Sequence, residues 1–118
     1  MSGILHDKSF DFALKVIAAY KEIVKNHKEY VMSKQLLKAG TSIGAMVRES
    51  EFAQSKADFI SKLSIGLKEA NETEYWLLLL NESGYLLKQT SDELISNNKE
   101  LIRLLVASIK TTKKSINK

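Results

Sequence analysis

The stretch from Ser55 to Leu80 reads SKADFISKLSIGLKEANETEYWLLLL, and it predicts the longest helix of the chain. Ser55 and Asp58 have the S-x-x-D spacing of a helix start, in which the serine hydroxyl accepts a hydrogen bond from a backbone N–H of the first turn. Apolar residues then recur every three or four positions, the period of one helix face: Phe59, Leu63, Leu67, Ala70, Leu77 and Leu78. The pattern predicts a helix over about residues 55–87, against which shorter helices must pack.

Two apolar stripes run along the segment expected to form the first helix, about residues 7–26. One stripe comprises Phe10, Ala13, Leu14, Ile17, Tyr20 and Val24, and the other comprises Phe12, Val16, Ala19 and Ile23. A single stripe is enough for the core of a bundle. The extra stripe indicates either a wide core face or a contact between subunits, and we assign Phe12, Val16 and Ile23 to a subunit interface.

The second helix is expected over about residues 31–52, and its centre, from Gly40 to Gly44, reads GTSIG. Glycine costs up to ~1 kcal/mol in a helix relative to alanine, so two interpretations compete, a break in the helix or a close helix contact. Antiparallel pairing with the helix from residue 55 favours the contact, because it aligns Gly40 with Leu67, Thr41 with Gly66, and Gly44 with Leu63. We therefore predict a tight helix crossing at Gly40, Gly44 and Gly66.

The fourth helix is expected to start near Thr90, which forms a T-x-x-E capping box with Glu93. The expected helices, at about residues 7–26, 31–52, 55–87 and 91–113, are joined by short connections, and no segment shows a convincing strand alternation. This pattern predicts an all-α fold, an up-down-up-down antiparallel four-helix bundle. A chain of 118 residues is long enough for one such domain, which we place over residues 1–118.

The net charge of +4 is concentrated at the C-terminal end of the chain. Residues 110–118 form a basic tail that contains Lys110, Lys113, Lys114 and Lys118 and no acidic residue, so the rest of the chain is neutral. Lysines at the end of a helix suit its negative dipole, which is the purely structural explanation. The functional interpretation is that these lysines bind the phosphates of RNA or DNA.

The composition indicates neither secretion nor a membrane span. The chain has no cysteine, which excludes disulfides and thiolate chemistry. Its start, MSGILHDKSF, lacks the apolar region of a signal peptide. The longest apolar run, Tyr75 to Leu80, is far shorter than the ~20 residues that a membrane span needs. We expect a cytoplasmic protein without a membrane partner.

The residue patterns of catalysis and metal binding are missing from the sequence. Di-iron sites in four-helix bundles need Glu-x-x-His pairs, and neither His6 nor His27 follows a glutamate at that spacing. Arg48 lies beside Asp58 in the antiparallel register described above, which we interpret as a structural ion pair. We expect no enzymatic activity, no metal, no cofactor and no small-molecule substrate.

The run Tyr75-Trp76-Leu77-Leu78-Leu79-Leu80 covers more than one helical turn, so part of it must face away from the core of its own bundle. An exposed apolar patch of this kind marks a subunit interface. We assign Tyr75, Trp76, Leu79 and Leu80 to that interface. The alternative is that Trp76 or Leu80 lies under a terminal loop.

The run from Ser33 to Leu80 resembles the four-helix bundle proteins that are encoded in 23S rRNA intervening sequences. The motifs GTSIG, an Arg-Glu pair, AQSKADF and KEANETEYWL carry the likeness, and the ending Ile109-Lys-Thr-Thr-Lys113 extends it. The resemblance implies a cytoplasmic bacterial protein that assembles as a homopentamer. The chain is also similar to the accessory variability proteins of diversity-generating retroelements, which are basic pentameric bundles that bind nucleic acid and a reverse transcriptase.

Together these observations predict a non-enzymatic oligomeric helical bundle that acts as a nucleic-acid-associated accessory factor. The alternative is a structural or protein-binding scaffold without a nucleic-acid role. The two hypotheses differ in whether residues 110–118 bind RNA or DNA.

Overall fold

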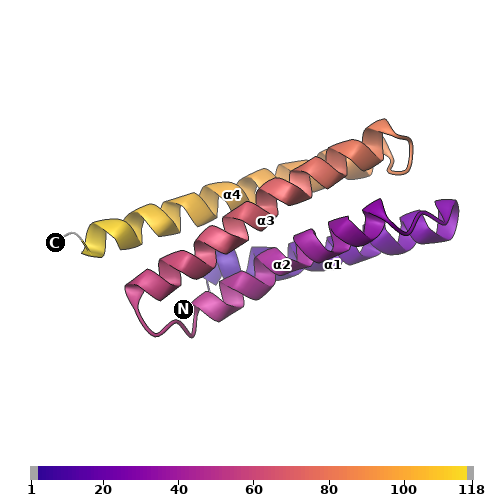
Figure 1. The fold of residues 1–118 in the computed structure, drawn as a ribbon. Coiled ribbons are helices and arrows are strands. Elements are labelled where there is room, and N and C mark those ends of the chain that lie inside the picture. The colour runs from indigo at the N-terminus through magenta and orange to yellow at the C-terminus, as the bar shows by residue number, and fades with distance from the viewer. Residues whose placement is uncertain (1–2, 117–118) are drawn as a thin grey trace.

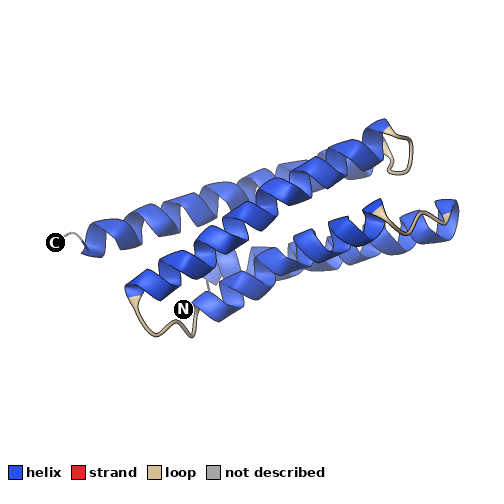
Figure 2. Ribbon diagram, viewed as in Figure 1, coloured by secondary structure: helices blue, strands red, loops and turns tan. Residues whose placement is uncertain are grey.

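A computed structural model describes residues 3–116 of the chain and shows four long helices joined by short connections (Figure 1). The helices are α1 (Gly3–His27), α2 (Met32–Ser50), α3 (Lys56–Glu82) and α4 (Lys88–Ile116). Successive helices run in opposite directions, and the loops lie at the two ends of a body that measures 52 × 21 × 20 Å (Figure 2). The predicted all-α four-helix bundle is confirmed.

Helix α3 begins at the predicted Ser55 cap, but it does not end where the sequence predicted. Ser55 is the N-cap residue, and its side chain accepts a hydrogen bond from the backbone N–H of Asp58 at 3.0 Å. The helix ends at Glu82, five residues before the predicted end. Gly84 takes a φ of +87°, a left-handed conformation that glycine adopts without strain and that turns the chain out of the helix.

The predicted capping box of the fourth helix is wrong, because α4 begins at Lys88, ahead of Thr90. Thr90 and Glu93 therefore lie inside the helix rather than at its start. The α3–α4 connection is closed by the backbone N–H groups of Tyr85 and Leu86, which both donate to the carbonyl of Leu80, at 2.8 and 3.1 Å.

The first turn of α2 is capped by the side chain of Glu29, a contact that no standard capping motif in the sequence predicts. Its carboxylate accepts hydrogen bonds from the backbone N–H groups of Val31 and Met32 at 3.0 Å and of Ser33 at 2.8 Å. Partial burial acts to raise the pKa of the Glu29 carboxyl, but these donors outweigh it and hold the pKa below its ordinary value. An acid at this position also complements the positive end of the helix dipole.

The apolar stripe of α1 that packs into the core of the bundle is the second one, which contains Phe12 and Val16. Phe12, Val16 and Ile23 are at most 1% exposed, and Leu80 of α3 is wholly buried. Their predicted place in a subunit interface is therefore wrong, since a side chain enclosed by its own bundle cannot contact another subunit. The stripe that contains Phe10 and Leu14 faces outward instead.

The small residues at the centre of α2 allow a close approach, but the neighbour differs from the predicted one. A methyl group on Gly40 would lie 2.8 Å from both methyl carbons of Val16, and one on Gly44 would lie 3.2 Å from the Ser9 carbonyl oxygen. Both glycines thus face α1 rather than α3. Gly66 of α3 faces α2, where Met46 Cβ would lie at 3.5 Å from its added methyl group.

One fully buried polar side chain joins α3 to α4. Asn98 lies in the core, and its Nδ2 donates to the carbonyl oxygen of Ala70 at 2.8 Å. Among residues 3–116, its Oδ1 accepts no hydrogen bond. An unsatisfied buried acceptor costs free energy, which offsets the stabilisation that the Asn98–Ala70 hydrogen bond provides.

Candidate functional site

Exposed apolar side chains gather on the outer faces of two helices. On α1, Phe10 is 57% and Leu14 is 51% exposed; on α3, Tyr75 is 56% and Leu78 is 46% exposed. Helices α1 and α3 each pack against α2 and α4 but share no contact with each other, so they occupy diagonal corners of the bundle. The monomer therefore presents two different apolar surfaces that point in different directions.

The residues assigned to the interface around position 75 divide between the surface and the interior. Tyr75 is exposed, as the assignment requires. Trp76 is half-buried, packs against the core and donates from Nε1 to Glu72 Oε2 at 3.1 Å. Leu79 is also half-buried. Leu78, which the prediction left out, is more exposed than Trp76, because it lies one turn from Tyr75 on the outward face.

The α1 surface borders a groove of about 290 Å³ on the α1–α2 face. Phe10, Ala13 and Ile17 form one side of the groove, and Gly44 and Arg48 belong to the other. The groove extends the apolar surface of α1 onto α2.

The predicted ion pair between Arg48 and Asp58 does not form. Within residues 3–116, the Arg48 side chain contacts no carboxylate, and it borders the α1–α2 groove instead. One position further around α2, Glu49 faces α3 and pairs with Lys62 at 3.4 Å. Asp58 accepts a hydrogen bond from the Gln54 backbone N–H at 3.3 Å and thereby supports the start of α3. The charged contact between α2 and α3 thus involves different residues on both helices from those of the predicted pair.

The basic residues of the C-terminal end lie together at one end of the bundle. Lys110, Lys113 and Lys114 are exposed on the last turns of α4, and none of them pairs with a carboxylate of the described residues. Lys118, the fourth predicted residue, lies outside the described range. The structure adds Lys56, from the start of α3, whose Nζ donates to the Ser115 hydroxyl. The start of α1 lies at this same end (Figure 1).

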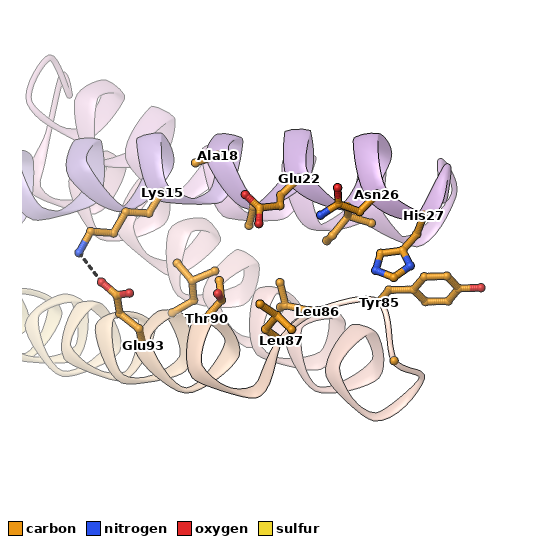
Figure 3. Close-up of a pocket in the computed structure, with 14 residues that line it drawn as sticks. Lys15, Ala18, Glu22, Asn26, His27, Tyr85, Leu86, Leu87, Thr90 and Glu93 are labelled. Carbon is orange, nitrogen blue, oxygen red and sulfur yellow. Dashed lines mark hydrogen bonds and ion pairs between the residues drawn. The ribbon is translucent and has the colours of Figure 1, made fainter.

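The contact between α1 and α4 is the smallest of the four helix contacts, and it is joined by two ion pairs. Lys8 lies 3.2 Å from Glu100, and Lys15 lies 3.2 Å from Glu93. Beyond the second pair, towards the α3–α4 connection, the helices leave a cleft of about 370 Å³ (Figure 3).

The two histidines make structural contacts. His6 Nδ1 lies 2.6 Å from Glu51 Oε2 and joins the start of α1 to the end of α2. The His27 ring meets the Tyr85 ring edge to face, with their centroids 5.4 Å apart. Residues 3–116 contain no group of three or more His, Asp or Glu side chains placed to hold a metal ion. None of the described helices is long and apolar enough to span a membrane.

Fold and surfaces together define an up-and-down four-helix bundle with outward apolar faces and one basic end. The model of the 23S rRNA-intervening sequence protein family matches residues 4–107, and the chain belongs to this family. The chain is also similar to a solved structure, a protein of unknown function from the S23 ribosomal protein family of Bacteroides thetaiotaomicron. That similarity has a TM-score of 0.89 and 50% sequence identity, and it covers 91% of this chain and 99% of the other. No curated protein matches the chain.

Proposed function

We propose that the protein is a non-enzymatic oligomer of the bacterial cytoplasm that binds RNA or DNA through its basic end. The observation that carries the proposal is the cluster formed by Lys56, Lys110, Lys113 and Lys114, whose α4 members have no acidic partner among the described residues. Free ammonium groups attract phosphates and release counterions when they bind. A single chain offers few such contacts, so useful affinity depends on several copies acting together.

The two apolar surfaces support assembly into a ring. A twofold dimer buries the same surface from each subunit, whereas a head-to-tail contact joins two different surfaces and closes into a ring or extends into a filament. Phe10 and Leu14 of one subunit can pack against Tyr75 and Leu78 of the next. The homopentamer implied by the family resemblance is a closed ring of this kind. Such a ring carries five basic ends, and linked weak sites bind far more tightly than one.

Binding is tested by fluorescence anisotropy with a labelled single-stranded RNA and a DNA of the same sequence. The triple variant Lys110→Gln, Lys113→Gln and Lys114→Gln should lose most of its affinity at about 50 mM salt. The slope of log affinity against log salt should fall by about 2 for each chain engaged. The matched control is Lys21→Gln, Lys25→Gln and Lys34→Gln, which removes three exposed lysines near the opposite end. Equal losses in the two triple variants would contradict a localised site.

Assembly is tested separately by light scattering. The double variant Phe10→Glu and Leu14→Glu should yield monomers, whereas Lys21→Glu on the same helix should leave the oligomer intact. If the unmodified protein is a monomer at working concentration, the ring is excluded.

The alternative function, a protein-binding scaffold without a nucleic-acid role, is favoured by Phe52, whose side chain is 80% exposed in the α2–α3 connection. A scaffold predicts no salt-sensitive binding of either nucleic acid. Affinity capture from the source cell, followed by comparison of bound RNA and protein with a Phe52→Ser variant, distinguishes the two functions.

A further inference from the structure

The cleft between α1 and α4 has the size and the lining of a small-molecule site. Its volume of about 370 Å³ falls within the range of known ligand pockets, which begins at roughly 300 Å³. Its floor consists of four apolar side chains that are at most 7% exposed, Ala19, Ile23, Leu86 and Leu94. The cleft exists because the helix pairs α1–α2 and α3–α4 separate beyond the Lys15–Glu93 pair.

The polar groups of the cleft carry an excess of negative charge. Lys15, its only ammonium group, is engaged by Glu93 at 3.2 Å and by Asp11 at 3.9 Å. Glu22, by contrast, has no ion-pair partner within residues 3–116. Figure 3 shows that Glu22 and Asn26, one turn apart on α1, both extend across the cleft towards α4. They place a free carboxylate and an amide above the apolar floor.

Two aromatic side chains lie at the far end of the cleft. His27 and Tyr85 are in edge-to-face contact there, and the Tyr85 ring points away from the cleft (Figure 3). Leu87 is 72% exposed at the rim, so an apolar molecule would cover it on entering. The site thus combines an apolar floor, the His27 ring at one end and one unpaired carboxylate.

We propose that this cleft binds a small organic cation with an aromatic or aliphatic body, of the aryl-alkyl amine class. The body lies on Ile23, Leu86 and Leu94, and the ammonium group donates hydrogen bonds to Glu22 and to the side-chain carbonyl of Asn26. No residue pattern in the sequence indicates this site, since its walls come from two segments distant in sequence, residues 15–27 and 84–94. The site is separate from the basic end, which lies at the opposite end of the bundle.

The test is a titration of the full-length protein, in its own oligomeric state, followed by ¹H–¹⁵N correlation spectra. The probe is tryptamine, and the comparison probe is indole-3-propionate, which has the same ring and the opposite charge. Tryptamine should cause saturable shifts of the Ala18, Glu22 and Gly84 amides. Its affinity should exceed that of indole-3-propionate, and Glu22→Gln should weaken tryptamine binding by about two- to fivefold, as expected for a partly solvated ion pair.

Two further variants locate the site. Ala18→Trp fills the cleft from an exposed position, so it should abolish binding without disturbing the fold, which the helical circular dichroism signal checks. Glu82→Gln removes an exposed carboxylate outside the cleft and should leave the affinity unchanged. The proposal is overturned if no cleft amide shifts, if both probes bind equally, or if Ala18→Trp or Glu22→Gln binds tryptamine as tightly as the unmodified protein.

Discussion

Replacing Gly40 with alanine should destabilise the bundle, although alanine is the better helix former. Taken alone, the change favours the helix by about 1 kcal/mol. The new methyl group, however, would lie 2.8 Å from both methyl carbons of Val16. Val16 is wholly buried and its branched side chain has little freedom to rotate, so overpacking should cost about 1–3 kcal/mol. We expect a net loss of about 1 kcal/mol in the free energy of unfolding.

Gly66→Ala provides the matched control in the neighbouring helix. Its added methyl group would meet Met46 Cβ at 3.5 Å, which is an ordinary van der Waals contact. The propensity gain is then retained, and the free energy of unfolding should rise by about 0.5–1 kcal/mol. The two substitutions have the same chemistry and opposite expected signs.

The measurement is urea unfolding followed by circular dichroism, at one fixed chain concentration because assembly adds to the apparent stability. A double-mutant cycle with Val16→Ala isolates the contact. Without the valine methyl groups, Gly40→Ala should no longer destabilise, which gives a coupling of about 1–2 kcal/mol. If Gly40→Ala stabilises the protein as much as Gly66→Ala does, the close approach of α1 and α2 is refuted.

Three further outcomes follow from polar contacts. Asn98→Leu removes a buried acceptor that the described residues leave unsatisfied. The free energy of unfolding should therefore change little or rise by about 1 kcal/mol. A loss above about 2 kcal/mol would contradict this account. Glu29 has a lowered pKa in the folded state, so the unfolded chain binds more protons as the pH falls and the stabilisation present above its unfolded-state pKa is lost. Urea unfolding at a series of acidic pH values should therefore show a weaker decline for Glu29→Gln, and an unchanged decline would disprove the cap. A double-mutant cycle on Lys15 and Glu93 should give a coupling below about 1 kcal/mol that decreases with salt, because both side chains are partly solvated.

The helices were predictable because each carries an apolar repeat and lacks proline. The start of α3 was predictable to the residue, since a Ser55 cap depends only on neighbours within one turn. The end of α3 was placed too late. Gly84, the one glycine of that region, was a usable signal, because a left-handed residue ends a helix.

The face of α1 that enters the core was not predictable from periodicity, because both stripes are apolar. The choice depends on a contact between segments distant in sequence, where Gly40 and Gly44 admit Val16 and Ser9 of α1. Side-chain size along α1 is no guide to this choice, since the buried stripe holds Phe12 and Ile23 as well as Ala19. The usable signal was the pair of glycines on α2, which need a neighbouring helix close by.

The candidate surfaces were only partly accessible to sequence reasoning. The exposed C-terminal lysines could be located, since a helix end with no acidic neighbours is visible in the sequence. The sequence could not show that Lys56 joins these lysines, nor which charged residues line the α1–α4 cleft, because both depend on which helices pack together. The charged contact with α3 is made by Glu49 rather than by its neighbour Arg48, because successive side chains point in different directions around a helix.

The weak contact between α1 and α4 has a kinetic consequence. Hairpins α1–α2 and α3–α4 form from residues close in sequence, which is a fast process. The Lys15–Glu93 and Lys8–Glu100 pairs instead close loops of 78 and 92 residues. This boundary should be the last to form and the first to open, so amide hydrogens that face it should exchange sooner than those between α2 and α3. A ligand held there would slow that exchange.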